Sequence, residues 1–146
     1  MPNYYFSAAV LTDEDVVMLR KRTEGANAGK WELPFTALDV TCENFQKAAA
    51  RMVAGEMKVP LTRVETLAVM SRDDLEGYDG NVDMTFFVGL IEKGADLSHL
   101  EADGWTMVPI NGLGEDDVVP EHVVVFEALG TKMATAPDTI VPIERN

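Results

Sequence analysis

One carboxylate, Glu56, stands among apolar residues in the stretch RMVAGEMKV, residues 51–59. A carboxylate on a helix is a potential ligand for a hard cation such as Mg²⁺, which prefers oxygen ligands. The same stretch also fits the end of a helix that packs on a core and leaves its charged residue in solvent. The surrounding elements must distinguish a metal site from an ordinary helix end.

Apolar residues before Glu56 recur at three- and four-residue spacing, which predicts a helix with one buried face. They are Phe45, Ala48, Ala49, Met52, Val53 and Met57. Thr41 is the expected N-cap, and Pro60 ends the helix. At about 100° per residue, Glu43 points roughly 140° away from Glu56, and Arg51 also lies off the Glu56 face. We therefore expect Glu43 to stabilise the helix start and Arg51 to pair with a loop carboxylate.

The rest of the chain predicts strands around this helix. Residues 4–11, 16–19, 31–35, 64–70, 82–91 and 104–110 mix β-branched and aromatic residues, and residues 120–129 fit a second helix that begins with a proline. The order β-β-β-α-β-β-β-α is typical of an α+β domain with a mixed sheet. We expect one domain over residues 1–130 and an extended tail over 131–146, which carries two prolines.

Charge and composition restrict the kinds of molecule that this chain can bind. The 146 residues carry a net charge of −13, which opposes binding to a long nucleic acid because phosphate contacts dominate that affinity. The one local concentration of cations, LRKR at 19–22, makes Arg20 and Arg22 candidates for binding a small phosphorylated ligand. No apolar run is long enough to span a membrane, and MPNYYFSAAV lacks the basic start of a signal peptide, so we expect a cytoplasmic protein. His122 is interpreted as a surface residue of the second helix.

These residues together resemble the Nudix superfamily of nucleotide-linked pyrophosphohydrolases. Its lead-in, Trp-x-x-Pro-Gly-Gly, is matched by Trp31 and Pro34. Its box, G-x5-E-x7-R-E-U-x-E-E-x-G-U with U a bulky aliphatic residue, is matched by Glu43, Arg51 and Glu56, with Val53 and Val59 at aliphatic positions. WTMVPINGL, residues 105–113, resembles the segment before the last helix of the family. The resemblance implies an α/β/α sandwich with a mixed central sheet and two main helices, and Mg²⁺ as cofactor if the protein is active. Many relatives are homodimers, but the sequence leaves the oligomeric state of this chain open.

The departures from the family pattern fall in its chemical core. Phe35 and Thr36 stand where the Gly-Gly pair follows the proline, and Ala37 and Lys58 replace the two glycines of the box. Met52 and Gly55 replace two of the three glutamates that would converge on Mg²⁺. A thioether is a poor ligand for magnesium, and glycine offers no side chain. One carboxylate in three remains.

Three interpretations stay open. In the first, the hydrolase chemistry is lost or reduced, and the chain binds a nucleotide-like ligand or a partner. In the second, an active pyrophosphohydrolase rebuilds its Mg²⁺ site from Glu56 and acids outside the helix. In the third, the domain is an unrelated α+β fold. We expect lost or altered activity, with Glu56 as the catalytic or metal-binding candidate if any activity remains.

Overall fold

A mixed β-sheet forms the centre of the molecule. The structure, a computed structural model, describes residues 2–135, and at 112, 115 and 130–135 it describes the backbone alone. The strand order is β3-β2-β1-β6-β5, with β4 paired to β1 and β7 paired to β2. β1 and β6 run parallel, and the other pairs are antiparallel. The strands are β1 Asn3–Asp13, β2 Val16–Lys21, β3 Trp31–Glu32, β4 Phe35–Ala37, β5 Leu61–Arg72, β6 Asn81–Ile91 and β7 Thr106–Pro109.

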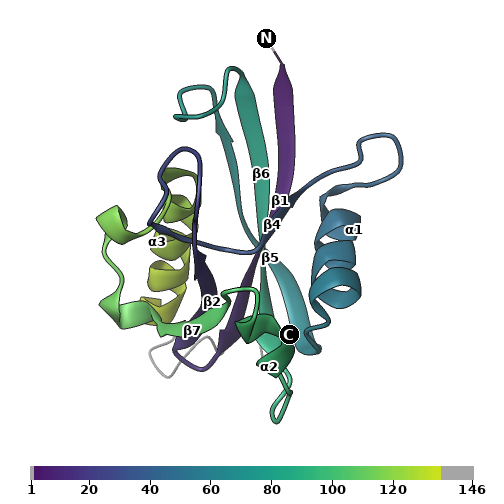
Figure 1. Cartoon of the computed structure of the whole chain (residues 1–146), viewed down its shortest axis with the longest axis vertical. Helices are drawn as coiled ribbons and strands as arrows, with labels where there is room; N and C mark the ends of the chain where they lie inside the picture. Colours follow the sequence, from purple (N-terminus) through teal and green to yellow (C-terminus); the bar gives the residue numbers. More distant parts are fainter. Residues whose placement is uncertain (1, 136–146) are drawn as a thin grey trace.

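Two main helices cover the sheet. The first consists of α1, Phe45–Ala50, which continues as the π-helix η1, Arg51–Met57. The second is α3, Pro120–Thr135, and the two lie on opposite sides of the sheet (Figure 1). Shorter elements are α2 Ser98–Glu101, η2 Ile110–Gly112 and η3 Glu115–Asp117. The predicted α/β/α sandwich is therefore confirmed.

Two details of the helices differ from the prediction. The sequence did not predict α2, because a single turn with one buried residue, Leu100, leaves no periodic pattern. α3 continues to Thr135, so the first five residues of the segment expected to be extended are helical. Residues 136–146 of that segment lie outside the described residues. No helix within the described range is long and apolar enough to cross a membrane.

Both faces of the central strands are buried, which explains their continuous apolar runs. In β1, Ala8 and Val10 belong to the apolar cluster on the α3 side, whereas Ala9 and Leu11 belong to the cluster on the α1 side. The second cluster also contains Met52 and the other inward residues of the first helix: Val53 and Met57. The sheet thus fixes the orientation of the segment that resembles the Nudix box.

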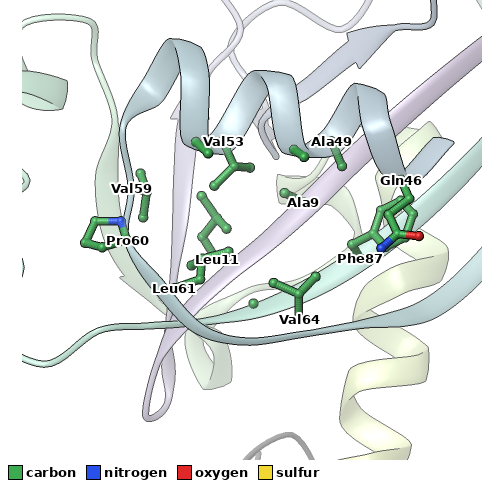
Figure 2. Close-up of a pocket in the computed structure, with 13 residues that line it drawn as sticks. Ala9, Leu11, Gln46, Ala49, Val53, Val59, Pro60, Leu61, Val64 and Phe87 are labelled. Carbon is green, nitrogen blue, oxygen red and sulfur yellow. The ribbon is translucent and has the colours of Figure 1, made fainter. Parts of the chain in front are cut away.

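Small side chains leave an apolar hollow of about 370 Å³ between this helix and the sheet. Figure 2 shows Ala49 and Val53 facing it from the helix, and Leu61 and Val64 facing it from β5. Leu61 lies directly over Gly89 of β6, where a Cβ atom would approach Leu61 Cδ1 to 2.7 Å. Glycine therefore lets β5 and β6 pack closely at the floor of this hollow.

Candidate functional site

The loop before α1 is held by its own side chains. Asn44, not Thr41, is the N-cap, and its side chain accepts a hydrogen bond of 2.8 Å from the backbone N–H of Lys47. The Thr41 hydroxyl instead donates to the Asp39 carboxylate at 2.6 Å. These contacts with Thr41 and with the Cys42 thiol lower the pKa of Asp39. The expectation that Thr41 caps the helix was therefore wrong.

The π-helical turn places Arg51 beside Glu56. Arg51 Nη1 lies 2.8 Å from Glu56 Oε2. In an α-helix residues five positions apart point in different directions, but a π-helix bonds residue i to residue i+5 and so aligns them. The expectation that Arg51 lies off the Glu56 face was wrong, because it assumed a regular α-helix.

Glu43 also binds Arg51, as expected of a loop carboxylate. Its two oxygens accept from Arg51 Nε at 2.6 Å and from Nη2 at 2.9 Å, and this bidentate pair lowers the pKa of Glu43 and raises that of Arg51. Arg51 further donates to the carbonyl of Ala37 at 3.1 Å and to the hydroxyl of Thr36 at 3.5 Å. With the bond to Glu56, all five N–H donors of the guanidinium have an acceptor.

The two other box positions that carry metal-binding glutamates in the resembling family do not supply carboxylates. The Met52 side chain is 4% exposed and packs in the core, so this position faces the sheet. Gly55 faces open space, since a Cβ atom there would meet nothing within 4 Å. Among the described residues, no group of three or more His, Cys, Asp or Glu side chains lies close enough together to hold an ion. The residues present therefore do not fit the Mg²⁺ that the resemblance implies.

The lead-in residues make contacts that hold the local fold. Trp31 lies under Lys21, whose Nζ is 4.8 Å from the ring centroid, and its carbonyl accepts from Val119 N–H at 2.9 Å. Pro34 is buried, and its carbonyl accepts from Ala9 N–H at 2.9 Å. Phe35, in place of the first glycine of the family, packs edge-on against His122 with ring centroids 5.2 Å apart. An aromatic core contact thus replaces the backbone opening that glycine would give.

The two candidate ligand arginines differ in their surroundings. Arg22 is mostly buried and bound to Glu32 at 2.7 Å and to Glu121 at 3.2 Å. The Arg20 side chain is 39% exposed, stacks on Trp105 at 4.3 Å, and makes only a 3.5 Å contact with Glu32. Both line a cleft of about 410 Å³; its other lining residues are Thr23, Glu24, Glu32, Phe35 and Asp103. Of the two arginines, Arg20 therefore has the guanidinium that a ligand in the cleft can reach.

A buried polar group at the start of α3 was not predicted. His122 is fully buried and accepts a 3.0 Å hydrogen bond from Leu33 N–H at Nδ1, and no described residue bonds to its Nε2. Burial, with a contribution from the charge of Arg22, lowers its pKa to about 3. Glu121 and Glu32 are also buried, and the Tyr78 hydroxyl lies 3.4 Å from Glu121. The interpretation of His122 as a surface residue was wrong, since the first turn of α3 packs beneath the segment around Leu33.

Cys42 has no features of a nucleophile. It is exposed, and the neighbouring Asp39 carboxylate raises its pKa, which disfavours the reactive thiolate. Cys42 also precedes the N-cap, Asn44, and so lies outside the first turn of α1.

Structural comparison identifies the fold. The NrtR protein of Shewanella oneidensis superposes with a TM-score of 0.72 at 20% identity, over 91% of this chain and 65% of that chain. This chain thus spans slightly less than two thirds of NrtR. The NUDIX domain of the same protein, complexed with ADP ribose, superposes with a TM-score of 0.72 at 17% identity, over 91% and 90% of the two chains.

A MutT NUDIX hydrolase from Burkholderia pseudomallei gives a TM-score of 0.69 at 17% identity, over 88% of this chain and 98% of that chain. Comparison of the sequence with family models and with curated proteins gives no match. The superposition of about nine tenths of this chain on several Nudix structures shows that the chain has the Nudix fold.

Proposed function

We propose that this Nudix-fold chain binds a small nucleotide-like ligand and that its Mg²⁺-dependent hydrolase activity is lost or strongly reduced. The observation that supports this most directly is the saturation of Arg51. Its guanidinium lies against Glu43 and Glu56, the two box carboxylates that remain.

The electrostatics of this cluster oppose a divalent cation. Mg²⁺ requires near-octahedral oxygen coordination, usually from one or more carboxylates and from substrate phosphates. Here Glu56 Oε2 accepts from Arg51 at 2.8 Å, so an ion bound to the other oxygen of Glu56 would lie close to the positive guanidinium. No second helix carboxylate assists, because Met52 is in the core and position 55 has no side chain. The chain's own residues therefore bind one another where the resemblance implies a metal.

The cleft beside Arg20 has the chemistry for the ligand. Its exposed guanidinium can bind a phosphate group, and Phe35 offers an aromatic surface at the same opening. Glu24 and Asp103, also in the cleft, can accept hydrogen bonds from sugar hydroxyls. A ligand that combines phosphates with ribose, as ADP-ribose does, fits this mixture better than a bare polyphosphate. The ADP ribose held by the NrtR NUDIX domain supports the same choice.

Isothermal titration of ADP-ribose, with EDTA and then with Mg²⁺, tests the binding. We expect binding without Mg²⁺, and a weaker affinity in Arg20→Ala. Arg72→Ala removes an exposed arginine that pairs with Asp74 outside the cleft, and this matched control should bind normally. Failure to bind ADP-ribose, or an equal loss in both variants, would contradict the assignment of the cleft.

Phosphate-release assays over ADP-ribose, dinucleoside polyphosphates and nucleoside triphosphates test the loss of catalysis. We expect no Mg²⁺-dependent turnover at ordinary enzyme rates. Turnover that Glu56→Gln abolishes would overturn the proposal. It would support instead an active pyrophosphohydrolase with a metal site rebuilt around Glu56.

We also propose that the chain does not bind long nucleic acids. NrtR from S. oneidensis was crystallised with a 27mer DNA, but this chain covers 63% of that protein and carries a net charge of −13. Fluorescence anisotropy with a labelled duplex at low salt, where phosphate contacts are strongest, checks the expectation of no binding.

A further inference from the structure

The apolar hollow beneath the helix formed by α1 and η1 lies beside the edge strand β5. Among the described residues that line it none is charged, and Gln46 has the only polar side chain. Val64 of β5 lines the hollow and is 56% exposed (Figure 2). No described residue pairs with the outer side of β5. Proteins usually cover both an open edge strand and a contiguous apolar surface.

Val69 extends this apolar surface along β5. It lies opposite Thr85 of β6, whereas Val64 lies opposite Gly89. Because side chains alternate along a strand, positions 85 and 89 lie on one face of the sheet, and so do their partners on β5. Val69 is 71% exposed, and with Val40 these two valines are the large apolar side chains that the described part of the chain leaves exposed. The hollow and its surroundings thus form one uncovered apolar area.

The C-terminal tail contains a segment of matching chemistry. Residues 136–146 lie outside the described residues and follow α3, which ends at Thr135. Within them, residues 139–143 read TIVPI and carry no charge. The large aliphatic residues of this segment are Ile140, Val141 and Ile143. An uncharged segment suits a hollow without charged residues, because a buried charge without a partner is costly.

The direction of α3 brings the tail to the end of the sheet where the hollow lies. Glu121, at the start of α3, lies 3.4 Å from the hydroxyl of Tyr78, in the loop that follows β5. Because α3 also packs against β5, it runs back along this strand toward its first residues. Leu61 and Val64, which line the hollow, belong to that part of β5. The chain therefore leaves α3 near the hollow, on the opposite face of the sheet.

The hollow is within reach of residues 139–143. Packed layers lie about 10 Å apart, so the path from α3 around β5 to the hollow takes roughly 15–20 Å. An extended chain advances about 3.1 Å per residue, which allows Ile140 to lie about 16 Å and Ile143 about 25 Å from Thr135. Pro137 and Pro142 favour such an extended backbone. No movement of α3 is needed.

We propose that residues 139–143 of this chain pass around β5 and occupy the hollow, with their aliphatic side chains against Leu61 and Val64. An apolar cavity of about 150 Å³ holds a benzene-sized molecule. The hollow, at about 370 Å³, therefore has room for two branched aliphatic side chains. The tail also covers the outer side of β5, as loops cover edge strands in other proteins. The contact is separate from the ligand cleft, so the proposed function does not depend on it.

Cysteine cross-linking within one chain tests this contact. In a Cys42→Ser background, Val64→Cys is combined with Ile140→Cys or with Ile143→Cys, and disulfide formation under mild oxidation is followed by mass and by non-reducing gel electrophoresis. Val69→Cys replaces Val64→Cys in the matched controls, since position 69 is more exposed and lies roughly 15 Å further along the same strand. A disulfide requires Cα atoms within about 7 Å, so we expect at least one pair with position 64 to close about tenfold faster than its control.

Three results would overturn the proposal. Equal rates at positions 64 and 69 would mean that the tail contacts the strand only at random. Disulfides that form only between different chains would mean that a second copy occupies the hollow. If neither pair with position 64 closes, although a thiol reagent modifies both cysteines after unfolding in urea, the tail does not reach the hollow.

Binding of the dye ANS, which fluoresces on exposed apolar surface, gives an independent measurement. Ile140→Asp with Ile143→Asp should release the tail and raise ANS fluorescence several-fold, while the circular dichroism spectrum stays that of the wild type. Thr139→Asp with Asn146→Asp adds the same charge to the tail but keeps its aliphatic residues, so this control should leave the fluorescence unchanged. Equal fluorescence of the wild type and the first variant would overturn the proposal, because the hollow would then be equally open in both.

Discussion

Replacing Met52 and Gly55 by glutamate, one at a time, measures whether each position of the helix formed by α1 and η1 faces the core or the solvent. Met52 is 4% exposed in a cluster with Leu11, Met18 and Trp105, whereas Gly55 borders open space. Although the family pattern places glutamate at both positions, the structure predicts opposite consequences for Met52→Glu and Gly55→Glu. The difference follows from the burial of residue 52 against the sheet and the exposure of position 55.

The expected loss of stability for Met52→Glu has two parts. Loss of the buried apolar side chain costs less than the roughly 2–5 kcal/mol of a truncation to alanine, because glutamate fills most of the same volume. Burying a carboxylate without a cation adds a cost of several kcal/mol, which protonation or local rearrangement reduces. A total of about 4–5 kcal/mol approaches the lower end of the stability of a small domain, which is about 5–15 kcal/mol. For Gly55→Glu we expect a change within about 1 kcal/mol, in the stabilising direction, because glycine disfavours helix.

Urea denaturation followed by circular dichroism measures both changes. Met52→Leu is the control, since a similar volume without charge should cost less than about 1.5 kcal/mol. The loss of unfolding free energy in Met52→Glu should be smaller at pH 5 than at pH 7.5. Burial raises the pKa of the new carboxyl in the folded state, so the stability of the variant falls as pH rises. A Met52→Glu protein as stable as wild type would refute this orientation, and Mg²⁺-dependent hydrolysis in the double glutamate variant would show that position 52 faces the site.

Three further predictions concern buried or capping groups. Because the pKa of folded His122 is lowered to about 3, the unfolding free energy of the wild type should fall as pH drops from about 6.5 toward 3, by up to about 1.4 kcal/mol per pH unit. Urea unfolding of His122→Gln over the same pH range should show a smaller fall, because the variant lacks the histidine. Arg22→Met leaves Glu32 and Glu121 buried without their cation and should cost about 3 kcal/mol in the same assay at pH 7, against little for exposed Lys21→Met. Asn44→Ala removes the N-cap and should lower the unfolding free energy by about 1 kcal/mol.

The pattern of apolar residues predicted most of the fold, because the burial of a strand or helix face requires apolar residues at regular spacing. β1 and β6 have apolar residues on both faces, which is expected of central strands between two helical layers. The inward residues of the first helix were also identified correctly, since Met52, Val53 and Met57 are buried. These assignments depend on local periodicity, which a sequence displays directly.

The π-helical turn was not predictable in the same way. It changes the direction of Arg51 and Glu56 without changing which residues are apolar, so the pattern of Met52, Val53 and Met57 fits both helix types. A π-turn appears in α-helices mainly as a single inserted turn, frequently at functional sites. The contact between Arg51 and Glu56 is its direct consequence.

The buried polar residues were missed for a different reason. His122 and Glu32 are polar, and the sequence contains no periodic sign that they are covered. Their burial depends on contacts between segments about 90 residues apart, such as the bond from Leu33 N–H to His122 Nδ1. The one sign of these buried residues in the sequence was the group of cations in LRKR, residues 19–22. A buried carboxylate such as Glu32 needs a cation beside it, and Arg22 supplies it.

The pattern of retained and missing box residues agrees with a structural role for those that remain. Glu43 accepts from Asp39 N–H at 2.9 Å and binds Arg51, and Arg51 in turn binds the carbonyl of Ala37. These three contacts tie residues 37–43 to the helix without any ligand. The absent glutamates, at 52 and 55, are those whose role in the resembling family is to bind the metal. Retained loop contacts beside missing metal ligands therefore agree with the proposal that the chain has lost its magnesium chemistry.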